Sequence, residues 1–227
     1  MEPTLGVVEM LAGLRRGELV ASELVEAAIS RAREAATLGH DVEEIRCPYP
    51  STVIDDFLQY WGFVAWLQVK TGRLMMHRGF APSRVEPWTA AIAETFVGRK
   101  RATLGAFRRL RRFAHQYAEL FDTHDVIVSP VTSEPAPLLG YLDPALPFAT
   151  HNERLRAYVP FTPIQNVAGA PAISLPLGRS SRGLPIGVQF AGARGADRTL
   201  LELARTIEAA QPWPLVAPRE NWGTIAA

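Results

Sequence analysis

Residues 160–178 read PFTPIQNVAGAPAISLPLG, and this stretch does most to define the fold of the chain. Its apolar end at 172–177 and a second apolar run at 184–191 predict two strands, and the residues at 178–183 between them predict a turn. A helix capped by Asp197 is expected next. Its apolar side chains recur three and four residues apart, at Leu200, Leu201, Ala204 and Ile207.

The region before these strands is predicted to be mostly helical. Three helices are expected, from residue 51 past Lys70, at 87–97 and at 101–121. The apolar run DVIVSPV at 125–131 predicts a buried parallel strand, and DVEEIRC at 41–47 predicts another strand. Because strand, helix and strand alternate, we expect a right-handed crossover and an α/β fold with a small mixed β-sheet flanked by helices.

The composition fits one domain and indicates no highly charged partner. With 227 residues, 48% of them hydrophobic, the chain can bury one core. Its 24 basic and 23 acidic side chains nearly cancel, so neither nucleic acid nor a membrane is expected as a partner. The uncharged run at 57–69 is shorter than the about 20 residues that a membrane-spanning helix needs. The single Cys47 allows no internal disulfide, and the first residues do not look like a signal peptide, so a cytoplasmic location is expected.

Residues 160–178 resemble the carboxy-terminal signature of the amidase signature family. The resemblance continues through GLPIGVQFAG at 183–192 and ends near Trp213. DVIVSP at 125–130 is similar to the strand that precedes a proline-rich loop in that family. Several separate motifs, in the same order, therefore carry the resemblance.

The resemblance covers both ends of the family's fold and leaves out its middle. Residues 1–36 resemble the opening helices, and residues 38–213 resemble the carboxy-terminal part. The resemblance thus implies a single incomplete domain over 1–227, with a shortened amidase-signature fold. We expect that an internal deletion near residues 30–36 joins the two parts.

The resemblance implies amide hydrolysis by a serine nucleophile, a second serine on a cis peptide, a lysine base and a glycine- and serine-rich oxyanion loop. None of the 17 glycines adjoins another, so the sequence has no loop of the Gly-Gly-Ser-Ser-Gly-Gly type. The only adjacent serines, Ser180 and Ser181, lie in the predicted turn. Neither of the two lysines, Lys70 and Lys100, ends a predicted strand. We therefore expect no catalytic residues and a pseudoenzyme that is inactive on its own.

Other catalytic arrangements find little support in the sequence. Cys47 closes a predicted strand, so a buried apolar role is expected rather than a thiol dyad with a histidine. His115 and His124 match no metal-binding spacing. Two adjacent acidic pairs have side chains that point in different directions on a helix or strand: Glu43-Glu44 and Asp55-Asp56. There is no nucleotide-binding motif, and neither a metal nor a cofactor is expected.

The resemblance places four residues in the loop that walls the substrate pocket of intact members: Phe161, Thr162, Gln165 and Asn166. The alternative is that Asn166 and Gly169 only shape the turn before the next strand. Three hypotheses remain open: an amidase-family remnant without activity, a non-enzymatic binding or assembly module, and a hydrolase that works only when another chain supplies the missing segment. A small amide is the ligand expected for the residual pocket wall. Because absent neighbours would leave strand edges or apolar faces uncovered, self-association is also expected.

Overall fold

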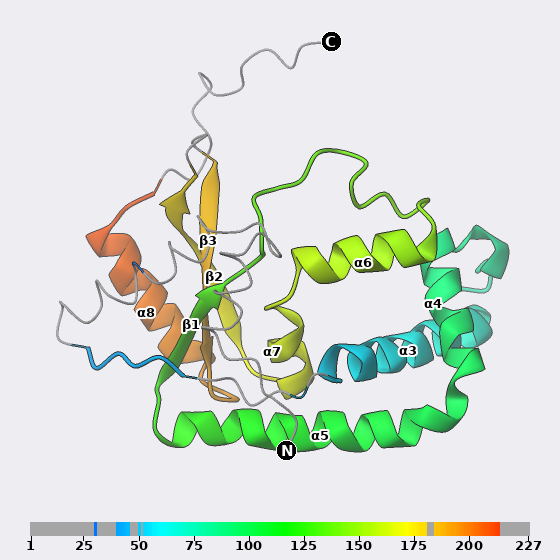
Figure 1. The fold of residues 1–227 in the computed structure, drawn as a ribbon, viewed down its shortest axis with the longest axis horizontal. Helices are drawn as coiled ribbons and strands as arrows, with labels where there is room; N and C mark the ends of the chain where they lie inside the picture. The colour runs from blue at the N-terminus through cyan, green and yellow to red at the C-terminus, as the bar shows by residue number, and fades with distance from the viewer. Residues whose placement is uncertain (1–29, 31–39, 46–49, 51, 181–183, 214–227) are drawn as a thin grey trace, which may run out of the picture.

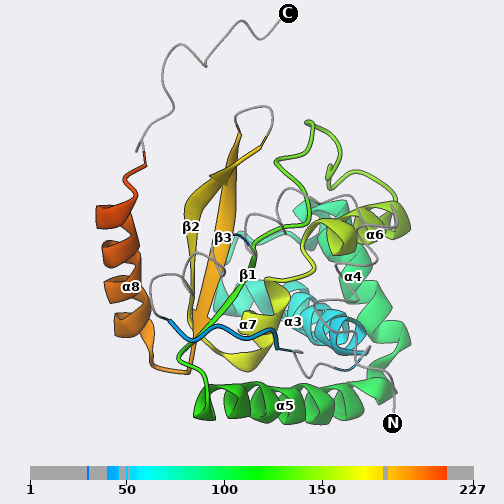
Figure 2. The same ribbon diagram turned by 60° about the vertical axis from the view of Figure 1, so that its left-hand side comes forward.

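A three-stranded antiparallel sheet lies between helices in this computed structural model (Figures 1 and 2). The structure describes residues 30, 40–45, 50, 52–180 and 184–213. The strands are β1 (Val126–Pro130), β2 (Ala172–Arg179) and β3 (Pro185–Gly192), and β3 is the central one. Helix α8 (Asp197–Ala210) packs on one face of the sheet, and the other helices lie on the opposite side (Figure 2).

The described helices opposite α8 pack together as one cluster. They are α3 (Val53–Met75), α4 (Pro87–Gly98), α5 (Thr103–Glu119), α6 (Phe148–Tyr158) and α7 (Pro163–Ala168), with short 3-10 turns η1 (Pro82–Arg84), η2 (Lys100–Ala102) and η3 (Leu120–Asp122). Helices α3 and α4 cross closely at Gly62, where an added Cβ would lie 2.7 Å from the carbonyl oxygen of Ile92. A larger residue than glycine at this crossing would push the two helices apart.

Separate apolar clusters fill the two sides of the sheet. Towards α8 the buried side chains are Leu175, Leu177, Val188, Phe190 and Leu200. Towards the helix cluster they are Val53, Phe113, Tyr117, Ile164 and Ala168, with a further cluster between α3 and α4 at Ala65, Trp88, Ile92 and Ala93. None of the described helices is long and apolar enough to cross a membrane.

The α/β class and the helices expected from residue 51 onwards are confirmed, but the predicted parallel strand pairing is wrong. Both β1 and β2 pair antiparallel with β3. They therefore run in the same direction as each other, as a crossover requires, but β3 lies between them. Strand β3, which forms a hairpin with β2, occupies the position beside β1 that a parallel strand would take. The described sheet is antiparallel throughout, although the sequence predicted a mixed one.

Three smaller expectations are also wrong or fall elsewhere. The described residues 41–45 form no strand, and residues 46–47 of that predicted strand lie outside the described residues. The predicted opening helices and most of the proposed deletion point also lie outside them. Helix α8 begins after Ala196, and no side chain caps it, so Asp197 is its first residue rather than its cap. The apolar run of β2 favours burial on both faces, but its residues alternate, with Leu175 and Leu177 buried and Ser174 and Pro176 exposed.

Candidate substrate-binding site

Helix α7 carries the residues that the sequence assigned to a pocket-forming loop. Pro163 occupies its first turn, where a missing backbone N–H costs nothing. Gly169 ends the helix in the left-handed conformation, with φ of 65°. Arg194, just after β3, donates from Nη2 to the carbonyl oxygen of Ala168 at 2.7 Å. The predicted loop is therefore a short helix whose carboxyl end is held by a guanidinium group.

Gln165 points from α7 into the protein and is 8% exposed. Its hydrogen bonds are satisfied when the amide nitrogen donates to the carbonyl oxygens of Phe161 (3.0 Å) and Thr162 (3.3 Å) and the amide oxygen accepts from Nε2 of Gln189 (3.2 Å). The hydroxyl of Tyr117 also lies 3.3 Å from this amide. Gln165 thus joins α7, α5 and the central strand.

A polar row crosses the sheet beneath α7. The register places Ser129 of β1 and Ser174 of β2 opposite Gln189 of β3, so the three side chains share one face. Nε2 of Gln189 donates to Oγ of Ser129 at 3.1 Å. In the described part of the chain, the hydroxyl of Ser129 donates to the carbonyl of Pro130 and has no histidine, lysine or carboxylate as a partner. The row can hold polar groups, but it lacks the base that would activate a serine.

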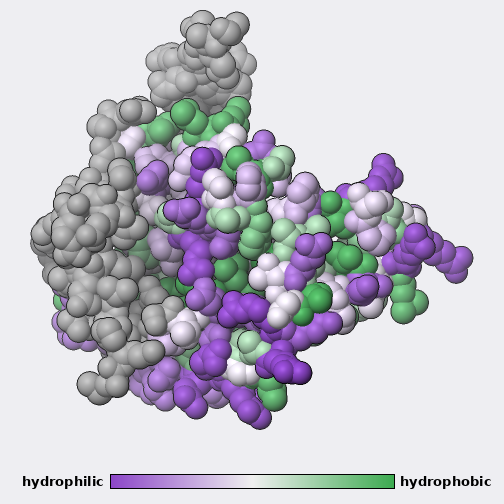
Figure 3. All heavy atoms as spheres, turned by 45° about the vertical axis from the view of Figure 1, so that its right-hand side comes forward, coloured by the Kyte–Doolittle hydropathy of each residue, from purple (hydrophilic) through white to green (hydrophobic). Residues whose placement is uncertain are grey.

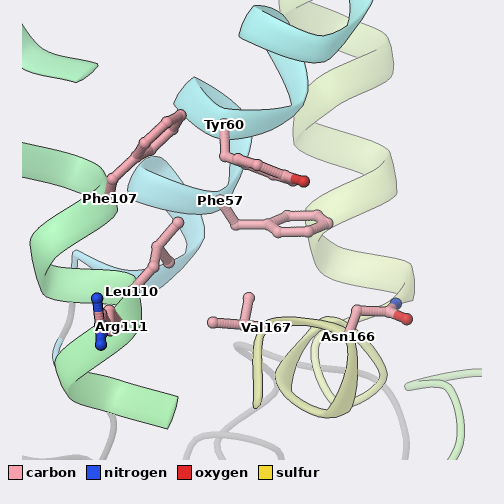
Figure 4. Close-up of a pocket in the computed structure, with 7 residues that line it drawn as sticks. All are labelled: Phe57, Tyr60, Phe107, Leu110, Arg111, Asn166 and Val167. Carbon is pink, nitrogen blue, oxygen red and sulfur yellow. The ribbon is translucent and has the colours of Figure 1, made fainter. Parts of the chain in front are cut away.

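Asn166 faces away from Gln165 and lines a shallow cavity of about 250 Å³. The lining residues come from α3, α5 and α7: Phe57, Tyr60, Phe107, Leu110, Arg111, Asn166 and Val167. Figure 4 shows Arg111 and Asn166 on opposite sides of the opening, with the rings of Phe57 and Tyr60 above it. The cavity therefore has apolar walls with an amide and a guanidinium group at its rim.

The structure separates the four residues predicted to bind substrate. Phe161 and Gln165 are buried, Thr162 is half-buried, and only Asn166 lines the cavity. Consecutive residues of a helix point about 100° apart, so Gln165 and Asn166 cannot face the same space. Asn166 is the member of this set that a ligand in the cavity can reach.

The described serine and lysine positions that the sequence singled out lie in a turn and in helical segments. Ser180 closes the β2–β3 turn: its N–H donates to the carbonyl of Leu184 at 2.8 Å, and its Oγ accepts from the N–H of Leu184 at 3.1 Å. Ser181 lies outside the described residues. Lys70 is exposed on α3, and Nζ of Lys100 lies 5.4 Å from the ring centroid of Trp66. Ser180 is thus confirmed as a turn residue.

The acidic side chains diverge as the sequence predicted. Asp55 pairs with Arg156 at 2.6 Å on the surface, whereas Asp56 is buried against Arg109. Over the described ranges, no three histidine, cysteine or acidic residues come together as a metal site. Cys47 falls outside those ranges, so the thiol dyad stays untested.

Sequence reasoning missed Gln189 and Arg194 as partners of α7. The signal for Gln189 was present, because an amide stands between Val188 and Phe190 in a strand whose two faces are both buried. Arg194 follows β3 in a loop, and nothing local in the sequence indicates that it reaches Ala168.

Comparisons with known proteins show what this sequence is similar to. The sequence model described as Amidase matches residues 14–201. "Putative amidase AmiC" of Mycobacterium tuberculosis (strain ATCC 25618 / H37Rv) is 42% identical over 178 residues, which cover 78% of this chain and 37% of the relative. The 6-aminohexanoate-cyclic-dimer hydrolase of Paenarthrobacter ureafaciens is 31% identical over 215 residues, covering 87% of this chain and 42% of the relative.

The fold is similar to that of solved structures as well. A structure of 6-aminohexanoate cyclic dimer hydrolase complexed with substrate matches with a TM-score of 0.68 and 27% identity, covering 85% of this chain and 42% of that one. The chain spans 37–42% of the length of these relatives.

Proposed function

Because this chain belongs to the amidase family, we propose that it is an amide-hydrolase relative that keeps part of a substrate-binding wall and cannot hydrolyse amides on its own. The chemistry of the family supports the amide-hydrolase kind. The inability to act alone is our inference from the residues of this chain.

One observation carries the proposal: no serine that the structure describes is set up as a nucleophile. The hydroxyl oxygen of Ser180 accepts a hydrogen bond within a turn. The hydroxyl of Ser129 accepts from the amide of Gln189 and donates to the carbonyl of Pro130. The absence of any Gly-Gly pair adds to this, because a tight oxyanion loop needs residues that let the backbone approach the substrate. Without an activated nucleophile among the described residues and without such a loop, we expect no amide hydrolysis by this chain alone.

The retained wall is proposed to be the cavity beside Asn166. The side-chain amide of Asn166 can both donate a hydrogen bond to an amide ligand and accept one from it, and Arg111 adds further donors. The rings of Phe57 and Tyr60 supply apolar surface. Phe161, Thr162 and Gln165 are proposed to contribute indirectly, because Gln165 fixes the start of α7 through the carbonyl groups of the other two. A cytoplasmic setting belongs to this proposal, in keeping with the single Cys47.

An amidase assay tests the catalytic half of the proposal. The purified chain should release no ammonia or amine above background from benzamide, acetanilide or hexanamide. Turnover that disappears in Ser180→Ala or Ser181→Ala would contradict it, because a turn serine would then be catalytic. Adding an intact relative, and separately a relative inactivated at its own nucleophile, shows whether this chain works only as a complementing part.

Ligand titration tests the binding half independently of activity. Benzamide should perturb NMR signals of residues around the cavity, and Asn166→Ala should weaken that binding several-fold. Gln116→Ala removes an exposed amide from α5 outside the cavity and should leave binding unchanged. Equal binding by all three proteins would remove Asn166 from the proposed site.

A further inference from the structure

One wall of the cavity beside Asn166 belongs to the most basic stretch of the chain. Between Glu94 and Glu119 the sequence has seven basic side chains and no acidic one, and α5 lies within this stretch. Figure 3 shows hydrophilic side chains gathered along the lower part of the described surface, at the level that α5 occupies in Figure 1. Because the charges of the whole chain nearly cancel, this excess of positive charge is local.

No described carboxylate offsets the positive charge at the cavity itself. None of the residues that line it is acidic. Asp56 of α3 is bound by Arg109, and Asp55 is paired with Arg156. The guanidinium group of Arg111 is exposed and makes no ion pair with any described residue. The charge and the donors of Arg111 are therefore available to a ligand in the cavity.

Asn166 offers a complementary group across the opening. Its amide nitrogen lies 3.5 Å from the carbonyl oxygen of Thr162, one turn earlier in the chain, whereas its amide oxygen has no partner within the described ranges. A guanidinium group can only donate, and an amide oxygen can only accept. A ligand that satisfies both groups therefore carries an acceptor at one end and an N–H at the other. Because hydrogen bonds to a charged partner are stronger, a carboxylate is the acceptor that suits Arg111 best.

Apolar side chains separate the two polar groups. Figure 4 shows the rings of Phe57 and Tyr60 above the opening, between Arg111 on one side and Asn166 on the other. The remaining lining residues are Phe107, Leu110 and Val167. The space of about 250 Å³ is smaller than the roughly 300–1,000 Å³ of most ligand pockets. The ligand is accordingly small, with a short apolar or aromatic spacer between its two polar ends.

We propose that this cavity prefers a small amide that also carries a carboxylate. The carboxylate lies at Arg111, the amide N–H donates to the side-chain oxygen of Asn166, and the spacer packs against the rings of Phe57 and Tyr60. This inference rests on the proposed function, because it names the class of amide that the same cavity takes. An exposed ion pair contributes only modestly to affinity, so Arg111 ranks one amide against another rather than supplying most of the binding. The same charge disfavours a cationic amide.

Three benzamides with para substituents of similar size and different charge test the preference. They are 4-carbamoylbenzoate, which is anionic, 4-(hydroxymethyl)benzamide, which is neutral, and 4-(aminomethyl)benzamide, which is cationic. NMR titration at low salt should give a dissociation constant about fivefold lower for the anion than for the neutral amide, and the highest value for the cation. Added salt should narrow these differences, because it screens charges at an exposed site. Equal binding of all three amides would overturn the proposal.

Substitutions on α5 test whether Arg111 sets the ranking. Arg111→Gln should bring the three dissociation constants together and leave that of the neutral amide almost unchanged, whereas Arg111→Lys should keep part of the preference. Arg112→Gln is the matched control, because Arg112 is the next exposed arginine of the helix and does not line the cavity. The control should retain the ranking. A ranking that persists in Arg111→Gln would assign the preference to the basic stretch as a whole and overturn the role of Arg111.

Asn166→Ala separates this inference from the proposed function. The substitution should weaken all three amides by a similar factor, and it should leave the weaker binding of benzoate, which has no amide, unchanged. If the neutral amide binds through Asn166 and the anionic amide binds no more tightly, the charge preference fails while the proposed amide site stands. If none of the amides binds, both fail. Benzoate that binds as tightly as 4-carbamoylbenzoate would overturn the contact between the amide and Asn166.

Discussion

Arg109 donates hydrogen bonds to both carboxylate oxygens of Asp56, from Nε to Oδ2 at 2.8 Å and from Nη2 to Oδ1 at 2.6 Å. The carboxylate side chain is only 6% exposed, and its hydrogen bond raises the pKa of Arg109. This pair ties α3 to α5. Two short charge-assisted bonds in a fixed fork make it the best-defined ion pair of the helix cluster.

Asp56→Asn should lower the free energy of unfolding by about 1–3 kcal/mol, because it removes the negative charge that is bonded to Arg109. The guanidinium group of Arg109 is half-exposed, and solvent screening limits the loss. The neighbouring Asp55→Asn change is the control, because its bond to Arg156 lies at the surface and should cost less than about 1 kcal/mol. Urea unfolding of both variants measures the difference. Equal losses would mean that burial of Asp56 contributes nothing.

Gln165→Leu should destabilise the protein by about 1–3 kcal/mol, because it removes a buried amide that bonds Gln189 and two carbonyl groups, and leaves Gln189 with Ser129 as its remaining partner. Asn166→Leu, one residue on, changes an exposed side chain and should stay within about 0.5 kcal/mol of the unmodified protein. Thermal unfolding of the two variants separates a structural glutamine from a surface asparagine. The prediction fails if the order is reversed.

Gly169→Ala should cost about 1 kcal/mol or more, because the backbone there has a positive φ and an added Cβ would lie 3.0 Å from Nη2 of Arg194. Gly98→Ala at the end of α4 is the comparison, since nothing lies within 4 Å of an added Cβ there. That variant should be neutral or slightly stabilising. Denaturant midpoints of both proteins give the test.

His124 should make stability depend on pH. The hydrogen bond from its ring to the carbonyl of Leu120, and then the bond to Glu43, raise its pKa above 6.5. A raised folded-state pKa means that the contribution is complete below the unfolded pKa and is lost as pH rises through the folded-state value. Nearby Asp125 acts in the same direction.

NMR titration of His124 should therefore show a pKa above 6.5 that falls in Glu43→Gln. Glu44→Gln, a change at the exposed neighbour, should leave the pKa unaltered. Stability of the unmodified protein should decline on going from slightly acid to slightly alkaline pH, and Glu43→Gln should flatten that decline. A histidine that titrates identically in all three proteins would rule out the contact with Glu43.

The helices and strands of the last two thirds of the chain could be predicted because their apolar spacing is regular. The α5 stripe and the β2–β3 hairpin illustrate this, since both are decided by neighbours in sequence. Strand partners could not be predicted in the same way: β1 and β3 meet across about sixty residues, and nothing near Val126 indicates that β3 rather than β2 lies beside it. The existence of a strand follows from local pattern, whereas its neighbours and their relative direction depend on the whole chain.

The candidate site was predicted less well for a related reason. The motif around Gln165 and Asn166 drew attention to the correct segment, but it could not show that the segment is helical. That helix turns one amide inward and the other outward. The cavity walls from α3 and α5 depend on how three helices meet, and periodicity alone does not give that arrangement.

The position of β3 has a consequence for how this protein folds while it is being synthesised on the ribosome. The central strand is the last of the three to be synthesised, so β1 and β2 lack the partner that they have in the described sheet until about residue 192 has emerged. Until then the nascent chain carries two apolar segments, 126–130 and 172–179, with open hydrogen-bonding edges. Sheet assembly is thus a late event that follows helix formation, and the interval before it is when a growing chain is most exposed to wrong partners.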